Sequence, residues 1–165
     1  MKVTTTQIVR LAIIGALYAV FTVVIAPFSY GPIQFRVSEI FKVFVLFDPV
    51  YALGIGIGTF FGNLASPFVG PWELVFMPLT DIAGGVIAYI LFIWMGKRLP
   101  LVALGVYAIT TSLSVGLMLS FYGVGGIWLL AGSVAIPEFI ILIGGYPVIK
   151  SIMHVLKNRG IYLEE

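Results

Sequence analysis

The sequence predicts an all-α, polytopic membrane protein that forms a bundle of six helices. Of its 165 residues 61% are hydrophobic and only 10% are charged, and the mean hydropathy is +1.14. A soluble domain is typically about one quarter charged. Long apolar runs alternate with short joints rich in Gly, Pro and charged residues. This is expected for membrane helices, each of which needs about 20 residues to cross the lipid core. We therefore expect a single membrane domain over residues 1–165.

The first span is predicted from about Ile8 to Ala26, before the helix-breaking Pro27. No small-residue cleavage site follows it, so we expect a retained span rather than a signal peptide. Small residues spaced i, i+3, i+4 and i+7 form one stripe on this helix. They are Ala12, Gly15, Ala16 and Ala19. Such a stripe serves either packing within the chain or docking of a separate membrane subunit.

The second and third segments follow closely. Ser38 is a plausible N-cap for a short segment, Glu39–Phe47, which cannot cross a bilayer by itself. Asp48-Pro49 is typical of the N-cap and first residue of a third span, about Val50–Ala65. Glycines four residues apart in this span allow a neighbouring helix to approach closely. They are Gly54, Gly58 and Gly62.

The last three spans are predicted over about Trp72–Gly96, Leu101–Phe121 and Leu129–Leu156. The last one is expected to break at Gly144-Gly145-Tyr146-Pro147. With six segments, nearly all basic residues fall on one side, which the positive-inside rule places in the cytoplasm with both termini. They are Lys2, Arg10, Lys97, Arg98, Lys150, Lys157 and Arg159, with Lys42 towards the same side. A five-segment arrangement would split them between the two faces.

Polar residues of the spans and outer loops then map to the outer half. They are Gln34, Arg36, Glu39, Asn63, Glu73, Asp81 and Glu138. A carboxylate costs about 2.5–3.5 kcal/mol at the centre of a membrane helix, so these acids should face water or a partner. Arg36 is the one base expected beside them and cannot balance four acids. We therefore predict a cationic or donor-rich ligand, or protonated acids.

Two of these acids lie beside prolines: Pro78 precedes Asp81 by three residues, and Pro137 directly precedes Glu138. A proline inside a helix frees a carbonyl oxygen that can line a polar site. Alternatively, the prolines only bend the helices, and the acids pair with Arg36 or with hydroxyls. We favour a site role for Glu138 and leave both alternatives open for Asp81.

Aromatic side chains are frequent near the outer edge: Tyr30, Phe35, Phe68, Trp72, Tyr122 and Trp128. Most fit an interfacial belt, but one or two of Tyr30, Phe35, Trp72 and Trp128 could stack on a flat ligand. Enzyme signatures are missing, because His154 is the one histidine and cysteine is absent. A carboxylate-pair hydrolase is a minor alternative. We expect no catalytic residue, metal, cofactor or nucleic-acid partner.

The stretch Tyr30–Glu39, YGPIQFRVSE, resembles the signature of the QueT family, which are substrate-binding S components of energy-coupling factor (ECF) transporters. The resemblance continues in register through Asn63–Pro67, the turn into Glu73, Val115–Leu117, Ser133–Glu138 and Gly145–Pro147. It implies a six-helix S component in the plasma membrane that captures a queuosine precursor, such as 7-aminomethyl-7-deazaguanine, from outside. A transmembrane coupling subunit (EcfT-like) and two cytoplasmic ATPases (EcfA-like) would be its partners and would alone use ATP.

The resemblance also implies roles for residues. The stripe on the first helix would dock the coupling subunit. Glu138 or Glu39 would accept the ligand's N–H donors, Gln34 and Asn63 would bind the remaining edge, and Arg36 would orient a carboxylate. The chain departs from the family pattern at Glu73, usually Asp, and at Pro137, usually Gly. It also departs at Thr111 and Met118, where Asn and Glu are frequent, and at Asp81, where a small residue is expected. An S component for another vitamin or heterocycle, or an autonomous small transporter or channel, are the alternatives.

Overall fold

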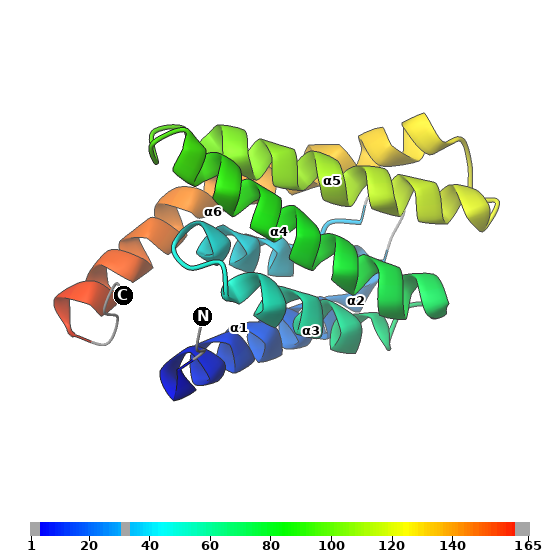
Figure 1. Ribbon diagram of the computed structural model, residues 1–165. Coiled ribbons are helices and arrows are strands. Elements are labelled where there is room, and N and C mark those ends of the chain that lie inside the picture. Colours follow the sequence, from blue (N-terminus) through cyan, green and yellow to red (C-terminus); the bar gives the residue numbers. More distant parts are fainter. Residues whose placement is uncertain (1–3, 31–33, 161–165) are drawn as a thin grey trace.

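The computed structural model describes residues 4–30 and 34–160, and all regular structure within them is helical (Figure 1). The elements in chain order are α1 Thr5–Val24, α2 Ala26–Ser29, η1 Val37–Leu46, α3 Tyr51–Asn63, η2 Trp72–Phe76, α4 Met77–Trp94, α5 Pro100–Phe121 and α6 Ile127–Asn158. Four stretches are long and apolar enough to cross a membrane, namely α1, η2 with α4, α5 and α6. The prediction of a helical, polytopic membrane protein is confirmed.

The two remaining segments, η1 and α3, are shorter, with 10 and 13 residues. The η1 segment is a 3₁₀ helix whose residues from Ser38 to Leu46 are all buried except Ile40, which is partly buried. Ser38 was expected to cap this helix but lies inside it, and its Oγ is 2.7 Å from Oγ1 of Thr22 on α1. The second predicted segment is thus a helix too short to cross a bilayer by itself, and it is buried among the long helices.

Close packing between α1 and α3 divides the predicted small-residue stripe. A Cβ added to Gly15 would lie 2.6 Å from the carbonyl oxygen of Gly54, and one added to Gly54 would lie 2.5 Å from that of Leu11. Only glycine fits at this separation. Gly15 therefore faces α3, whereas Ala12 and Ala16 remain exposed on α1.

The predicted start of the third span is corrected by two residues. Asp48 does not begin α3; its Oδ1 accepts a hydrogen bond of 2.9 Å from the Val50 amide, and the helix begins at Tyr51. The Asp side chain closes the turn that leads into the helix, as Asx turns do.

Prolines affect the last spans differently from the prediction. Pro78 lies in the first turn of α4, directly after the π-helical turn η2, so the helix changes type there. The expected break at Gly144–Pro147 is wrong, because α6 is continuous over 32 residues and includes Pro137 and Pro147. Gly145 packs against Ile40 of η1, where a Cβ would lie 2.5 Å from the isoleucine side chain. A proline removes one backbone hydrogen bond, and neighbouring helices can support the helix through it.

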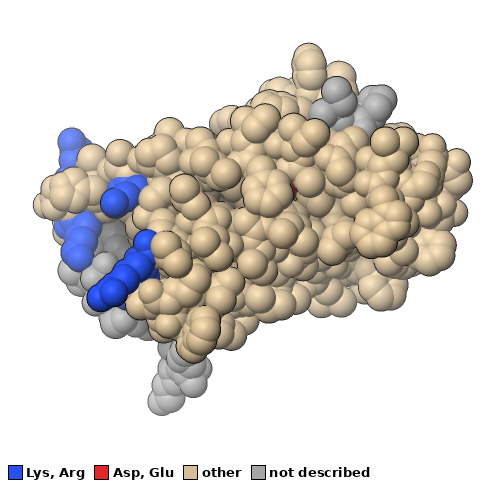
Figure 2. All heavy atoms as spheres, turned by 90° about the horizontal axis from the view of Figure 1, so that it is seen from above, with Lys and Arg blue, Asp and Glu red and all other residues tan. Residues whose placement is uncertain are grey.

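Exposed basic side chains gather at one end of the molecule, as Figure 2 shows for the face seen there. This is the end where α1 begins and α6 finishes (Figure 1). The exposed residues concerned are Lys97, Arg98, Lys150, Lys157 and Arg159. Their grouping agrees with the charge asymmetry seen along the sequence.

Candidate functional site

A buried lysine lies at the centre of the bundle with three carboxylates around it. Its Nζ is 2.5 Å from Glu39 Oε2, 2.9 Å from Asp81 Oδ1 and 3.0 Å from Glu138 Oε1. The lysine side chain is 0% exposed and those of its three acidic partners are at most 4% exposed. We call Glu39, Lys42, Asp81 and Glu138 the Lys42 cluster. Its members come from η1, α4 and α6.

Hydroxyl groups from three further helices complete the Lys42 cluster. The Tyr18 hydroxyl on α1 donates to Glu39 Oε1 at 2.7 Å, and Thr59 Oγ1 on α3 donates to Asp81 Oδ2 at 2.6 Å. On α5, Thr111 Oγ1 accepts from Lys42 Nζ at 2.9 Å. Every long element of the fold therefore contributes a polar group to this centre.

Tyr107 of α5 contacts two members of the same centre. Its ring centroid lies 4.9 Å from Lys42 Nζ, a favourable cation–π separation. Its hydroxyl donates to the backbone carbonyl of Asp81 at 2.6 Å. The ring and hydroxyl together fix both the cation and one acid.

The Lys42 cluster has an excess of negative charge. One ammonium faces three carboxylates, so its formal charge is −2 when all four groups are ionised. Removing an ion from water costs several kcal/mol even after relaxation. Binding a proton or a ligand cation would reduce this uncompensated negative charge, so the cluster favours either over remaining fully ionised.

A second polar group surrounds Arg36 at the start of η1. Its Nε donates to the Ser29 carbonyl at 3.0 Å and its Nη1 to Asn63 Oδ1 at 3.3 Å. The Asn63 amide in turn donates to the Glu73 carbonyl at 3.0 Å. The guanidinium carbon of Arg36 lies over the ring of Tyr30, 5.2 Å from the ring centroid. The Tyr30 hydroxyl donates a hydrogen bond to the Gly62 carbonyl. We call Tyr30, Arg36, Asn63 and Glu73 the Arg36 cluster.

Glu73 in the Arg36 cluster is 1% exposed, and its Oε2 has no hydrogen-bond partner within residues 4–30 and 34–160. Gln34 is also buried, with a positive φ of 47° that non-glycine residues seldom adopt. Glu73 therefore keeps unused hydrogen-bonding capacity.

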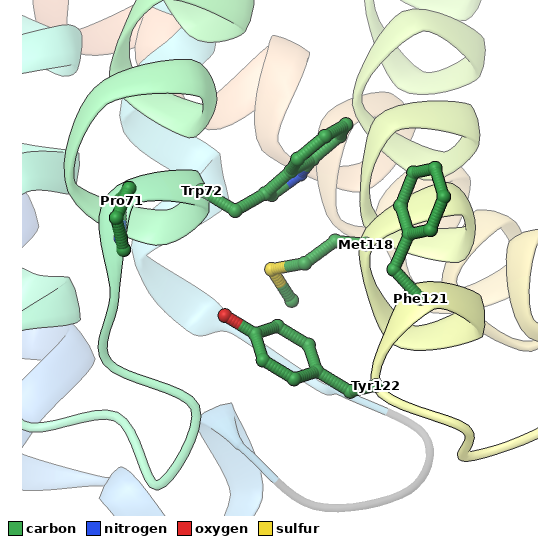
Figure 3. A pocket seen from close by; sticks show the side chains of 5 residues that line it. All are labelled: Pro71, Trp72, Met118, Phe121 and Tyr122. Carbon is green, nitrogen blue, oxygen red and sulfur yellow. The ribbon is translucent and has the colours of Figure 1, made fainter.

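Aromatic side chains line a pocket of about 430 Å³ between the start of η2 and the end of α5 (Figure 3). Its lining residues are Pro71, Trp72, Met118, Phe121 and Tyr122. Trp72 stacks on Phe76, with ring centroids 4.9 Å apart, and its buried Nε1 has no partner in the described part of the chain. The pocket can take a flat, largely apolar group.

Comparison with known proteins identifies the family. A family model described as "QueT transporter" matches residues 8–154. The chain belongs to the QueT transporter family. A curated relative, the queuosine precursor transporter QueT of Lactococcus lactis subsp. cremoris (strain MG1363), is 40% identical over 67 residues, which cover 39% of this chain and 40% of the relative. No solved structure matches the chain. The resemblance seen in the sequence is thus confirmed, and QueT is a family of transporters rather than of enzymes.

In this QueT protein the predicted site residues form two groups instead of one. Glu39, Asp81 and Glu138 meet at Lys42, whereas Asn63 and Glu73 lie with Arg36. Lys42 was expected towards the cytoplasmic side, and Arg36 was expected to be the one base among the acids. The expectation for Arg36 is wrong, because Lys42 balances part of the charge of three of these acids; the side of the membrane on which Lys42 lies stays a prediction. Asp81 pairs with a hydroxyl, as one of the two alternatives expected, because Thr59 Oγ1 donates a hydrogen bond to it.

Several residues around these acids were missed by sequence reasoning, namely Tyr18, Lys42, Thr59 and Tyr107. The spacing of Glu39 and Lys42, i and i+3 on an apolar helix, was the available signal. Among the stacking candidates of this QueT chain, Trp72 lines the pocket and Tyr30 lies under Arg36. Trp128 is 78% exposed and Phe35 39% exposed, as belt residues would be.

Proposed function

We propose that this QueT protein binds a queuosine precursor, a 7-deazaguanine such as 7-aminomethyl-7-deazaguanine, from outside the cell. It acts as the substrate-binding S component of an ECF importer in the plasma membrane, with both termini in the cytoplasm. The choice of compound is supported by the family to which the chain belongs and by the name of its relative in Lactococcus. The grouping of exposed basic residues at the end where α1 begins and α6 finishes supports the orientation.

The Lys42 cluster is the observation that carries this proposal. A 7-deazaguanine presents adjacent N–H donors that one carboxylate accepts together, and the aminomethyl group adds an ammonium. The cluster supplies three carboxylates against one lysine. Asn63 and Gln34 offer amides for the ring carbonyl, and Trp72 offers a face for stacking. Cationic, donor-rich and flat are the properties that these groups together select.

Binding to the purified protein tests the substrate class. In detergent micelles, calorimetry should show one molecule of 7-aminomethyl-7-deazaguanine bound per chain. The matched 7-deazaadenine, which lacks the same donor edge, should bind at least about 100-fold more weakly, because mismatched buried polar groups stay unpaired. Mass spectrometry of the small molecules that co-purify provides an independent measurement. Equal affinity for the two compounds would contradict the proposal.

The partner proposal concerns the exposed side of α1. Ala12 and Ala16 are exposed there, while Gly15 is taken up by α3. The transmembrane coupling subunit is proposed to dock on this face, and the two ATPases to bind that subunit from the cytoplasm. Small residues allow such close contact between membrane helices.

Adding bulk to α1 tests the docking face. Ala16→Trp should reduce co-purification of the coupling subunit by about tenfold or more, because a large side chain separates closely packed helices. Ligand affinity should not change. Ala83→Trp, at an exposed alanine of α4, serves as the matched control and should leave the complex intact. Uptake that continues unchanged in Ala16→Trp would instead favour an autonomous transporter.

A further inference from the structure

The three acids of the Lys42 cluster are held unequally. Glu39 is one 3₁₀ turn from Lys42 on the same segment, and its second oxygen accepts from Tyr18. Both oxygens of this acid are therefore engaged, and its backbone moves with Lys42.

Asp81 is also held through both of its carboxylate oxygens. Oδ1 faces Lys42, and Oδ2 accepts from Thr59 at 2.6 Å. Its backbone carbonyl also accepts from Tyr107. Side chain and backbone are thus both restrained by neighbouring helices.

Glu138 differs from these two acids. Within the described part of the chain its carboxylate is bound through Oε1 to Lys42, at 3.0 Å. Among residues 4–30 and 34–160, no hydroxyl on a neighbouring helix holds it as Tyr18 holds Glu39 and Thr59 holds Asp81. Releasing Lys42 would therefore free the Glu138 side chain, whereas the other two acids would stay in place.

Lys42 keeps its charge compensated when it releases Glu138, although it then loses one of its two hydrogen bonds within the described residues. An ammonium has three N–H donors, and four oxygen atoms lie within 3.0 Å of Nζ, one each from Glu39, Asp81, Glu138 and Thr111. Three oxygen atoms remain close to Nζ when Glu138 leaves. One of them is the Thr111 hydroxyl, and two are carboxylates that keep the cation compensated.

We propose that Glu138 is an exchangeable carboxylate, which Lys42 holds in the empty protein and which the cationic group of the ligand takes over on binding. This inference rests on the proposed function and narrows it to one acid. Two cations then face three carboxylates, so the formal charge of the centre changes from −2 to −1. Lys42 is a positioning residue in this scheme, and Glu138 determines the preference for a cation.

The test compares two probes that differ at one substituent, an ammonium against a neutral hydroxyl: 7-aminomethyl- and 7-hydroxymethyl-7-deazaguanine. Calorimetry is run on the wild-type protein, on Glu138→Gln and on the matched control Asp81→Asn. Each variant removes one carboxylate from the same cluster and changes its formal charge equally. The ratio of the two affinities is the readout, because a purely structural role would weaken both probes alike.

The wild-type protein should bind the ammonium probe about tenfold or more tightly than the hydroxymethyl probe, because charge-assisted hydrogen bonds are stronger than neutral ones. Glu138→Gln should bring the two affinities within about threefold, whereas Asp81→Asn should keep the preference. Loss of the preference in Asp81→Asn with its survival in Glu138→Gln would overturn the proposal, as would a ratio that neither variant changes. If neither probe binds the wild-type protein, the proposed substrate class fails, and the exchange fails with it.

A second measurement does not depend on the folding of a variant. Infrared difference spectra of the wild-type protein, recorded on adding the ammonium probe, should show a shift in the carboxylate stretching bands as Glu138 changes partner. The hydroxymethyl probe should produce a smaller shift. Binding of the ammonium probe with no change in these bands would show that the carboxylates keep their partners and would overturn the exchange.

Discussion

Replacing Lys42 with methionine should destabilise the folded protein by about 3–5 kcal/mol, the usual cost of removing one partner from a buried ion pair. Methionine has a similar length but leaves Glu39, Asp81 and Glu138 facing one another without their ammonium. Their like charges then repel at short range in a site from which water is excluded. We expect a low yield of folded protein and a lower unfolding temperature in detergent micelles.

Lys150→Met is the matched control for this substitution, because Lys150 is exposed near the end of α6. Its effect should remain within about 0.5 kcal/mol, as for most surface changes. Equal unfolding temperatures for the two variants would show that the three acids do not depend on Lys42. Rescue of Lys42→Met by a second change, Glu138→Gln, would locate the repulsion in the cluster.

Gly54→Ala should destabilise the protein by about 1–3 kcal/mol, the range for overpacking a closely packed contact. The new Cβ would lie 2.5 Å from the Leu11 carbonyl oxygen and 3.1 Å from the Leu11 Cα. Both are backbone atoms, so α1 itself would have to move away from α3. Thermal unfolding in micelles measures the loss.

The α6 helix provides the control for the glycine substitution. Gly132 is exposed within this helix, and a Cβ there would meet no atom within 4 Å. Gly132→Ala should be neutral or stabilising by up to about 1 kcal/mol, because alanine has the higher helix propensity. A loss of stability as large as that of Gly54→Ala would mean that glycine is needed for backbone freedom and not for close approach.

Much of the fold follows from patterns along the sequence. Apolar length predicts α1, α4, α5 and α6, because a lipid core imposes nearly the same requirement on each. The four-residue glycine spacing of α3 predicts its close approach to another helix, which the packing against Gly15 confirms. The resemblance around Tyr30–Glu39 predicts the family.

The candidate site was less predictable, because its charges pair across the bundle. Lys42 was grouped with the cytoplasmic bases, since a count of charges along the chain assigns a lysine to the nearest loop. Asp81 and Glu138 reach it only once α4 and α6 are packed around η1. Likewise, the motif Gly144–Pro147 has the local composition of a break, but packing of Gly145 against Ile40 keeps it helical.

The winding of η1 has a consequence for movement. A 3₁₀ helix rises about 2.0 Å per residue and an α-helix about 1.5 Å, so these 10 residues reach about 5 Å further than they would as an α-helix. Residues three apart are eclipsed in the first form and rotated by about 60° in the second. Rewinding η1 as an α-helix would shorten it and rotate Lys42 by about 60° relative to Glu39, although residues three apart remain neighbours on an α-helix. The pitch of a single backbone segment thus sets how closely these two charges are aligned and how far the segment reaches.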